Sequence, residues 1–530
     1  MGSHQRFPSK PSISSLKPLV SRSLNPGALS YRRELGSEGL VLRWSNAGDK
    51  AGCVMVSCLA SLEVEGQESE STMRYYEPFT DDAFHGGSSS HWALCVDTSP
   101  RENLPSPREP HSYTDRIRMA AQNAPERVVA LVYLLPTEFS FDSDAVRVPV
   151  GRTRIVACQR AHRGETVLKA LFEMVNARAV ATGCAFMLAS GAPGYYRLFD
   201  YEYALNVGRG LVTHVSDVRP YTPPADDPFS YNLREATLDD LPTIERLVQV
   251  LAPRANTEIF IGVKDTATLR AQLRWALGDR PEAYSGPEYP VHPFFVLEKC
   301  DANEPEPRIV AAAGLTLYKR SHGADVSPLL WDGMENVSAV VQALVPALIN
   351  AGNELPVTGG RAPGQLETLD WTIADAHPLR RWLLAHQLAV PTPETSRFDP
   401  SSALWVTIPS LPRFLNALVP ALNARLAAAV HIFGANYTAA LHISASRAMG
   451  GSVILRVTHG AVSIVSATNA KSDPDQRVSL PRAALIQLLM GYASWCELKK
   501  TYPDVAVEPA AVPLVEVLFP RRSVSSSMHL

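Results

Sequence analysis

The chain contains two short segments of similar sequence, and each precedes a helical pattern. One reads L-R-W-S-N-A-G-D from Leu42, and the other reads L-R-E-A-T-L-D-D from Leu233. In each, an arginine precedes an aspartate by six residues, and the aspartate is predicted to cap a helix, over 50–62 and 241–251. Each copy is followed by apolar runs that suit strands, 128–135 after the first and 294–297 and 309–317 after the second. The repetition therefore predicts two successive α/β units.

The rest of the chain divides around proline-rich segments. Residues 220–228 and 391–400 are expected to be linkers. After the second linker, a strand (404–408) and a helix (411–426) precede alternating runs typical of an antiparallel sheet and two further helices. This order predicts a small α+β domain. The predicted division is a basic disordered tail (1–36), domains at 37–218, 229–390 and 401–522, and a short tail (523–530), with a flexible insertion at Asp81–Asp115.

Bulk properties narrow the classes of function. With 530 residues the chain is too long for a single core, and its net charge of −3 gives no overall attraction to nucleic acid or anionic membranes. No apolar run is long enough for a membrane span. Seven scattered cysteines favour reduced thiols and a cytoplasmic protein. The first 33 residues carry six Lys or Arg and no acid, which leaves mitochondrial targeting as an alternative to a disordered tail.

The segment from Val156 to Ala204 carries the strongest chemical signal. An extended apolar run, Ile155–Cys158, leads through a basic turn with Arg160, His162 and Arg163 into a helix that begins near Glu165. Unpaired N–H groups and the helix dipole at such a junction favour a phosphate. A tyrosine-rich cluster follows, in which a phenol could transfer a proton. Together these features suggest a coenzyme-A-dependent acyltransferase; the alternative is a strand–turn–helix without a ligand.

Several motifs resemble those of a known superfamily. The basic turn looks like motif A of the GNAT N-acetyltransferases, and G-A-P-G-Y-Y-R-L-F-D-Y-E-Y-A resembles the Y-x-x-F-G-Y segment of the enhanced-intracellular-survival-type branch, with Asp200 in place of the glycine. The resemblance extends through His377-Pro378-Leu379, W-V-T-I-P-S-L-P-R-F-L, G-Y-A-S-W-C-E-L and L-F-P-R-R. It implies two tandem GNAT-like domains with mixed twisted sheets flanked by helices, the second degenerate, and a C-terminal sterol-carrier-like α+β domain.

The same resemblance implies roles for individual residues. Tyr196 would protonate the departing thiolate of acetyl-CoA, and the terminal carboxylate of Leu530 would deprotonate a primary amine on a small molecule or peptide. The strand positions Val156, Ala157 and Cys158 would pair with the pantetheine arm. The pyrophosphate would bind at the turn and helix start, which comprise Arg163, Gly164, Glu165, Thr166, Val167, Leu168 and Lys169. The resemblance implies no metal, and it leaves a homo-oligomer as an open alternative because related proteins tend to assemble.

Some alternatives remain open at this stage. Thr166 and Leu168 stand where motif A has small residues, and Glu165 would compete with a phosphate, so a catalytically degenerate GNAT-fold protein is one alternative. A second is a lipid- or ligand-binding module that uses the sterol-carrier-like domain. The tyrosines could simply fill an aromatic core, and Cys158 could be a small core residue.

Overall fold

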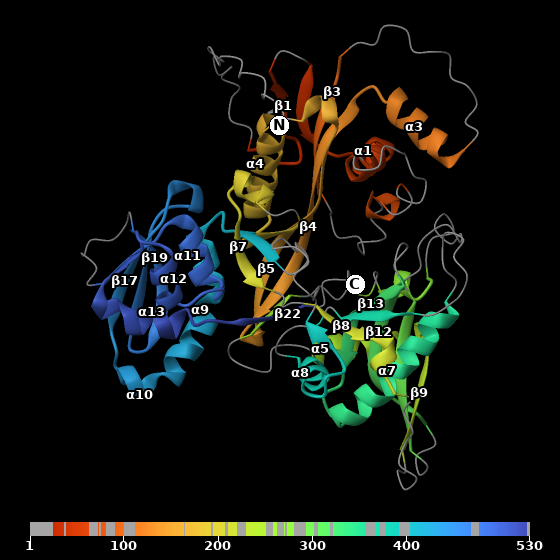
Figure 1. The fold of residues 1–530 in the computed structure, drawn as a ribbon. Coiled ribbons are helices and arrows are strands. Elements are labelled where there is room, and N and C mark those ends of the chain that lie inside the picture. Colours follow the sequence, from red (N-terminus) through yellow and green to blue (C-terminus); the bar gives the residue numbers. More distant parts are fainter. Residues whose placement is uncertain are drawn as a thin grey trace, which may run out of the picture.

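The protein is described by a computed structural model with three β-sheets flanked by helices (Figure 1). This mixed α/β architecture confirms the predicted fold class. The described residues are 25–36, 39–62, 73, 76–80, 91–99, 112–163, 165–191, 194–206, 210–219, 229–250, 258–261, 270, 273–279, 293–301, 306–317, 322–355, 366–371, 373, 377–391, 403–467 and 476–526.

The first sheet has ten strands in the order β1-β2-β3-β4-β5-β6-β16-β7, with β10 and β22 added beside the far end of β4. Helices α1 (Lys50–Leu62) and α3 (Tyr113–Asn123) lie on one face, and α4 (Glu165–Ala181) lies on the other (Figure 1). The strands are β1 (Arg32–Leu35), β2 (Leu40–Trp44), β3 (His91–Asp97), β4 (Arg127–Phe141), β5 (Ser143–Cys158), β6 (Phe186–Ser190), β7 (Glu202–Asn206), β10 (Glu258–Ile261), β16 (Ala403–Thr407) and β22 (Ser523–Ser526).

The second sheet has seven strands in the order β15-β8-β14-β13-β12-β11-β9. Its helices are α5 (Leu241–Val250), α7 (Val337–Glu354) and α8 (Pro378–Ala385). The strands are β8 (Leu211–His214), β9 (Phe229–Glu235), β11 (Phe294–Asp301), β12 (Arg308–Leu317), β13 (Gly323–Trp331), β14 (Thr368–Trp371) and β15 (Val390–Pro391).

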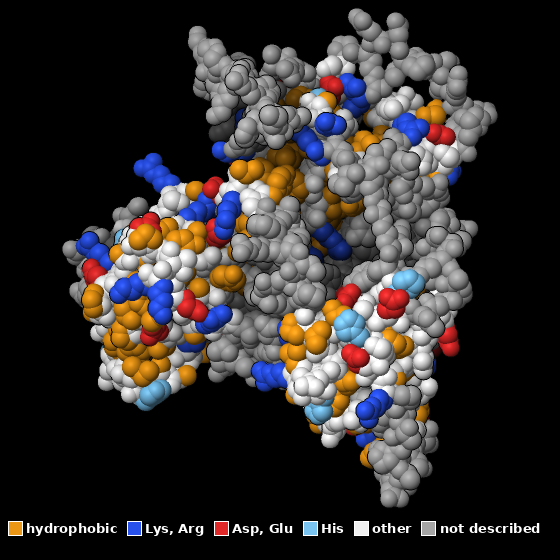
Figure 2. All heavy atoms as spheres, in the orientation of Figure 1, with side chains coloured by type: hydrophobic (Ala, Val, Ile, Leu, Met, Phe, Trp, Pro, Cys, Tyr) orange, Lys and Arg blue, Asp and Glu red, His pale blue; other side chains and the backbone are white. Residues whose placement is uncertain are grey.

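The third sheet has five strands in the order β19-β18-β17-β20-β21, and helices cover it. Its β17–β18–β19 meander is antiparallel, as the alternating runs predict. Figure 2 shows basic, acidic and apolar side chains interspersed over the visible face of this unit. The elements are β17 (Ala439–Ser444), β18 (Val453–Thr458), β19 (Ala461–Ser466), β20 (Gln476–Ser479), β21 (Ala506–Val507), α9 (Leu411–Ala428), α10 (Val430–Phe433), α11 (Arg482–Leu489), α12 (Trp495–Thr501) and α13 (Val512–Leu518).

The repeated segments form the same ion-paired turn in the first two units. Arg43 binds both carboxylate oxygens of Asp49, each at 2.7 Å, while Arg234 binds those of Asp240 at 2.7 and 2.8 Å. Each aspartate also accepts a hydrogen bond from the backbone N–H of the residue three positions before it. The aspartate therefore completes a capping box and is not itself the N-cap. Each arginine reaches a second carboxylate, that of Glu126 or Glu298. The sequence repeat is therefore a structural repeat.

Strand membership differs from the sequence division at several points. Residues 211–214 lie in the second sheet as β8, while 403–407 lie in the first sheet as β16. Part of each predicted tail also forms a strand, β1 at one end of the chain and β22 at the other.

The prediction of a flexible insertion at 81–115 is wrong for 91–97. These residues form β3, between β2 and β4, because a short apolar run lies inside the polar, proline-rich stretch. The predicted linkers at 220–228 and 391–400 lie outside the described residues, except that Pro391 belongs to β15.

The first and third units share one hydrophobic core. Phe141 and Phe186 at the lower end of the first sheet pack edge-to-face against Phe414 of α9, with ring centroids 6.5 and 5.9 Å apart. A buried ion cluster lies beside them: Asp142, in the β4–β5 turn, contacts Arg425 at 2.5 Å and Arg522 at 3.1 Å. The third unit is therefore fixed to the β4–β5 hairpin by apolar packing and by buried charges.

Two further properties concern membranes and thiols. Among the helices of the described residues, none combines the length and apolar character that crossing a bilayer requires. All seven cysteines are free thiols, and five of them are buried.

The ion-paired turns predict unequal losses of stability. Replacing Asp49 by Ala leaves the guanidinium of Arg43, 9% exposed, short of a partner, and we expect a loss of about 3 kcal/mol in the free energy of unfolding. Asp240→Ala should cost only about 1–2 kcal/mol, because Arg234 is 34% exposed and can be solvated. Urea unfolding measures the loss of unfolding free energy for both variants, and Asp239→Ala, at an exposed aspartate, is the control. Equal losses for Asp49→Ala and Asp240→Ala would contradict this ranking.

The second turn also predicts a dependence on pH. Hydrogen bonds from Arg234 outweigh partial burial and lower the pKa of Asp240 from its ordinary value of 3.8. The carboxylate therefore stabilises the fold above about pH 4, and this contribution is lost as pH falls through the lowered pKa. The difference in unfolding free energy between the wild type and Asp240→Ala should narrow on acidification. A constant difference down to pH 2 would contradict this assignment.

Candidate active site

The candidate site lies where two parallel strands of the first sheet separate. The β5–β6 ladder runs from Val150 with Phe186 to Thr153 with Ala189 and ends there. Beyond this point β5 continues beside β4, with Ala130 opposite Cys158, while β6 stays paired with β16 as far as Ser190. The candidate site is the region of β5 that follows the end of this ladder, residues 154–158.

A basic turn joins the end of β5 to helix α4. Gln159 anchors the turn to β4: its backbone N–H donates to the carbonyl of Val129 at 2.9 Å and its side-chain amide donates to that of Val128 at 3.1 Å. A single 3₁₀ turn, Arg160–His162, follows and leaves Arg160 and Arg163 exposed. The predicted strand, basic turn and helix start are therefore all present.

The first turn of α4 contains both polar and apolar side chains. Thr166 and Lys169 are exposed, whereas Val167 is buried in the core and Leu168 packs against it. Thr166 and Leu168 stand where motif A has small residues. Their side chains point in different directions, that of Thr166 toward solvent and that of Leu168 toward the core. Gly164 and the side chain of Glu165 lie outside the described residues.

Tyr196 occupies an aromatic cluster behind the point of divergence. It lies in the 3₁₀ helix η5 (Tyr195–Phe199), is 6% exposed, and donates its hydroxyl to the carbonyl of Ser190 at 3.0 Å. The rings of Phe172 and Trp405 lie 6.2 and 6.1 Å from its own. Burial, with Tyr195 close by, raises the pKa of Tyr196 well above its ordinary value, so the phenol keeps its proton.

Two other tyrosines flank Tyr196. Tyr201 is fully buried, and its hydroxyl lies 3.4 Å from that of Thr153, the last β5 residue paired with β6. Tyr195 is half-buried; burial and the nearby thiol of Cys158 raise its pKa, while Arg163 opposes the rise. Tyr195 therefore lies toward the strand end and the basic turn, whereas Tyr196 lies toward the end of β6.

Asp200 adopts the backbone conformation that the family glycine would favour. Its φ is 68° and its ψ is 25°, in the left-handed region that aspartate tolerates better than most residues. Its carboxylate pairs with Arg482 of α11 at 2.8 Å. The turn after the tyrosine cluster thus keeps a glycine-like geometry and gains an ion pair with the third unit.

The second unit has a strand–turn–helix junction of opposite charge. In this unit β13 leads into α7 through a turn that carries Asp332 and Glu335 and no basic residue. Asp332 accepts the backbone N–H groups of Met334 and Glu335, at 2.9 and 3.3 Å. Arg308 and Lys299 neutralise the turn from neighbouring strands. A carboxylate of the protein thus holds the N–H groups that a phosphate would need.

The structure brings most of the predicted residues together and adds one that the sequence did not reveal. Val156, Cys158, the basic turn and Tyr196 surround the divergence, whereas Leu530 lies outside the described residues. Trp405 is the missed residue: it is fully buried and stacks on Tyr203 with ring centroids 3.6 Å apart. A strand is predicted at 404–408, but the sequence carries no signal for the sheet that this strand joins.

Comparisons with known proteins establish the fold. A scan against protein-family models finds no match, and a search of curated proteins finds no relative. Among solved structures, the chain is similar to a "probable N-acyltransferase" from Enterococcus faecalis V583 (TM-score 0.56, 12% identity, 92% of this chain and 99% of the other). It is equally similar to a GCN5-related N-acetyltransferase from Anabaena variabilis (0.56, 11%, 92% and 99%). A third match is Eis1 from Mycobacterium abscessus (0.50, 11%, 93% and 100%). The chain therefore has the fold of these proteins over nearly its whole length.

The left-handed turn at Asp200 gives a prediction. Asp200→Gly relieves a conformational cost of about 1–2 kcal/mol and loses an exposed ion pair worth about 0–1 kcal/mol, so the stability should stay equal or rise slightly. Asp200→Val should lower the stability by about 2 kcal/mol, because a β-branched residue is strained at positive φ. Thermal unfolding of both variants measures this, and a destabilised glycine variant would show that the ion pair dominates.

Proposed function

We propose that the protein is an acyl-CoA-dependent N-acyltransferase that moves an acetyl group from acetyl-CoA to a primary amine of a small molecule or peptide. The observation that carries this proposal is the divergence of β5 and β6 beside a basic turn, a helix start and a buried phenol. In this proposal the amides of a pantetheine arm pair with β5 beyond the end of the β5–β6 ladder, and the pyrophosphate binds at the turn and the start of α4. The fold shared with solved N-acetyltransferases supports the same reading.

The proposed chemistry is direct transfer. The amine nitrogen attacks the thioester carbonyl, a carbon–nitrogen bond forms, and the carbon–sulfur bond breaks as the thiolate leaves. Tyr196 is the proposed acid: its phenol, kept neutral by burial, gives its proton to the thiolate and regains one from solvent. The base that takes the proton of the amine is, in this proposal, the terminal carboxylate of Leu530, in the residues that follow β22.

The other units have supporting roles in this proposal. The second unit lacks a basic turn at the described β13–α7 junction and is proposed to be the degenerate copy. The third unit, which resembles a sterol-carrier domain in sequence, supports the site because its α11 pairs with Asp200. We further propose that the protein is cytoplasmic.

Calorimetric titration with acetyl-CoA tests the proposal at its first step. The full chain should bind acetyl-CoA, and Arg163→Gln should weaken binding about threefold to tenfold, because an exposed cation beside a pyrophosphate contributes about 1 kcal/mol. Arg33→Gln, an exposed arginine on the edge strand β1, is the matched control. No binding at a large excess of acetyl-CoA would overturn the enzyme proposal.

The same titration tests the degenerate alternative, which the exposed Thr166 at the helix start favours. If the wild type does not bind and Thr166→Gly does, the chain is a GNAT-fold protein that has lost its coenzyme. If both bind, the side chain of Thr166 is compatible with the pyrophosphate.

Substitution of Tyr196 tests the assigned acid. Tyr196→Phe should lower kcat by about 10²–10⁴-fold, measured as thiol release with a panel of amines, while acetyl-CoA binding stays within about twofold. Tyr195→Phe serves as the comparison and should keep most of the turnover. If Tyr195→Phe shows the larger loss, the half-buried tyrosine is the acid instead.

A further inference from the structure

Trp405 reaches Tyr196 from a strand that follows the second unit in the chain. Its side chain, in β16, is fully buried, and its ring centroid lies 6.1 Å from that of Tyr196, with the two planes at 47°. The other aromatic neighbours of Tyr196 are Phe172, Tyr195 and Tyr201, at 6.2, 5.3 and 5.8 Å. These three belong to α4 or to the segment around Tyr196 itself. Trp405 is therefore the part of this aromatic cluster that a distant strand supplies.

The backbone of β16 places the indole beside the phenol. Leu404 pairs with Ser190, whose carbonyl accepts the hydroxyl of Tyr196 at 3.0 Å, and Trp405 pairs with Ala189. Because successive residues of a strand point to opposite faces, Leu404 packs in the core shared with the third unit, whereas Trp405 packs with Tyr196. Two consecutive residues of one strand thus fix the acceptor of the phenol and one wall around its ring.

The indole is itself held by neighbours on β7 and η5. An irregularity in the β16–β7 register places Trp405 opposite Tyr203, and their rings stack with centroids 3.6 Å apart. The guanidinium of Arg197 lies 5.6 Å from the centroid of the Trp405 ring, and Glu202 holds it with both carboxylate oxygens, at 2.7 and 3.2 Å. Packed against a stacked ring and a fixed cation, the indole has little freedom to turn.

The N–H group of the indole is a second unusual feature. It is buried and has no hydrogen-bond acceptor among the described residues. Trp371, in β14 of the second unit, is buried to the same degree, but its N–H donates to the hydroxyl of Thr213 at 2.8 Å. A buried donor without an acceptor costs free energy, and a phenylalanine would avoid this cost. The contrast favours a functional reason for the large ring at position 405.

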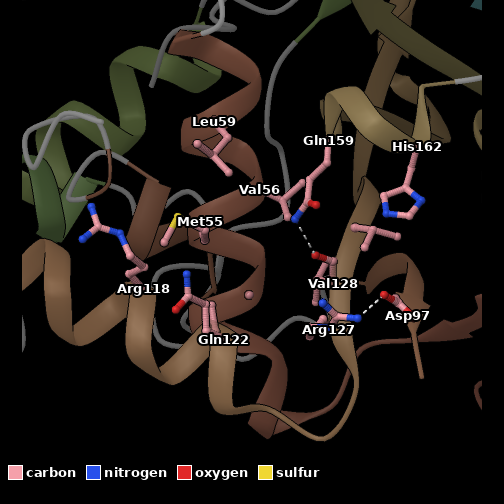
Figure 3. A pocket seen from close by; sticks show the side chains of 13 residues that line it. Met55, Val56, Leu59, Asp97, Arg118, Gln122, Arg127, Val128, Gln159 and His162 are labelled. Atoms are coloured by element: carbon pink, nitrogen blue, oxygen red, sulfur yellow. Dashed lines mark hydrogen bonds and ion pairs between the residues drawn. The ribbon is translucent and has the colours of Figure 1, made fainter. Parts of the chain in front are cut away.

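The basic turn is anchored on the other face of the sheet. A pocket of about 430 Å³ lies there, and its lining includes Gln159 and His162 of the turn (Figure 3). The side-chain amide of Gln159 donates to the carbonyl of Val128 at 3.1 Å. Trp405 and Tyr196 belong instead to the core on the α4 face. A change at Trp405 should therefore affect the chemical step and leave the binding of the coenzyme intact.

We propose that Trp405 is a positioning residue for the acetyl transfer: it holds the phenol of Tyr196 at the end of β6, directed at the departing thiolate. The inference rests on the proposed function, because Trp405 acts through the proposed acid. When the carbon–sulfur bond breaks, the proton passes from the phenol to the sulfur, and the indole keeps the ring in place during this step. A misplacement of about 1 Å in such a group can slow a reaction about a hundredfold.

Kinetics of the full chain test the inference, with thiol release from acetyl-CoA measured for a panel of amines. Trp405→Leu should lower kcat at least about tenfold and leave the KM for acetyl-CoA within about twofold. Trp405→Phe keeps an aromatic ring and should restore most of the turnover. Trp371→Leu, which removes a tryptophan of equal burial from the second unit, is the matched control and should keep kcat within about twofold. An equal loss of kcat in Trp371→Leu would overturn the inference.

Alkaline titration of tyrosine absorbance gives a readout that needs no turnover. Burial raises the pKa of Tyr196 well above its ordinary value of 10. Without the indole, this pKa should fall toward about 10, so one more tyrosine should ionise near that pH in Trp405→Leu than in the wild type. The double variant Trp405→Leu with Tyr196→Phe should lack this additional tyrosine. Circular dichroism at each pH verifies that the variants stay folded.

A second pair of variants replaces Trp405→Leu if that protein does not fold. Tyr203→Leu removes the ring stacked on Trp405 and leaves Trp405 itself in place, so kcat should fall about threefold or more. Tyr203→Phe keeps the stacked ring and should keep kcat. Full turnover in folded Tyr203→Leu would overturn the inference.

The outcomes separate the inference from the proposed function. If the wild type transfers acetyl groups and folded Trp405→Leu matches it in kcat and in tyrosine titration, the inference is overturned and the enzyme remains. If the wild type acetylates no amine but Trp405→Leu still exposes one more tyrosine, the hold of Trp405 on Tyr196 is supported and the proposed function is overturned. Absence of both turnover and the additional tyrosine would overturn both.

Discussion

The candidate site depends on where strand β6 finds its hydrogen-bond partners. β6 is paired with β5 only as far as Ala189, but with β16 as far as Ser190. Because β16 holds the end of β6, the two parallel strands separate, and the edge of β5 opens beside the basic turn. The carbonyl of Ser190, at the end of β6, then receives the hydroxyl of Tyr196. A strand from a distant part of the chain thus sets both the opening and the position of the phenol.

Local patterns predict local features well, and the structure shows why they fail elsewhere. The helical patterns at 50–62 and 241–251 correspond to α1 and α5, because a capping box and an amphipathic run act within a few residues. Sheet membership depends on partners far away in sequence, so β8 and β16 could not be assigned. The site was predictable in its turn and its tyrosines, but Trp405 was not, because its contacts come only with the tertiary fold.

The two larger units share one ion-paired turn but differ at the later junction between a strand and a helix. Both keep an arginine that joins a capping aspartate to a glutamate on a neighbouring element, with nearly equal distances. At the later strand–turn–helix junction they differ: one turn has exposed arginines, whereas the other holds Asp332 against its own N–H groups. The arginine–aspartate–glutamate cluster is thus present in both units, whereas exposed arginines at the described junction are found only in the first.

The strand composition of the first sheet also determines how late during synthesis this sheet can finish folding. Its strands include β10 from within the second unit, β16 from the segment before the third, and β22 within the last residues described. During synthesis from the N-terminus, β6 emerges well before its second partner β16, and the end of β4 emerges before β10. The opening beside β5 takes its final form only after β16 has emerged. The first unit, although it precedes the other two in the sequence, therefore finishes folding only after β16 and β22 have emerged.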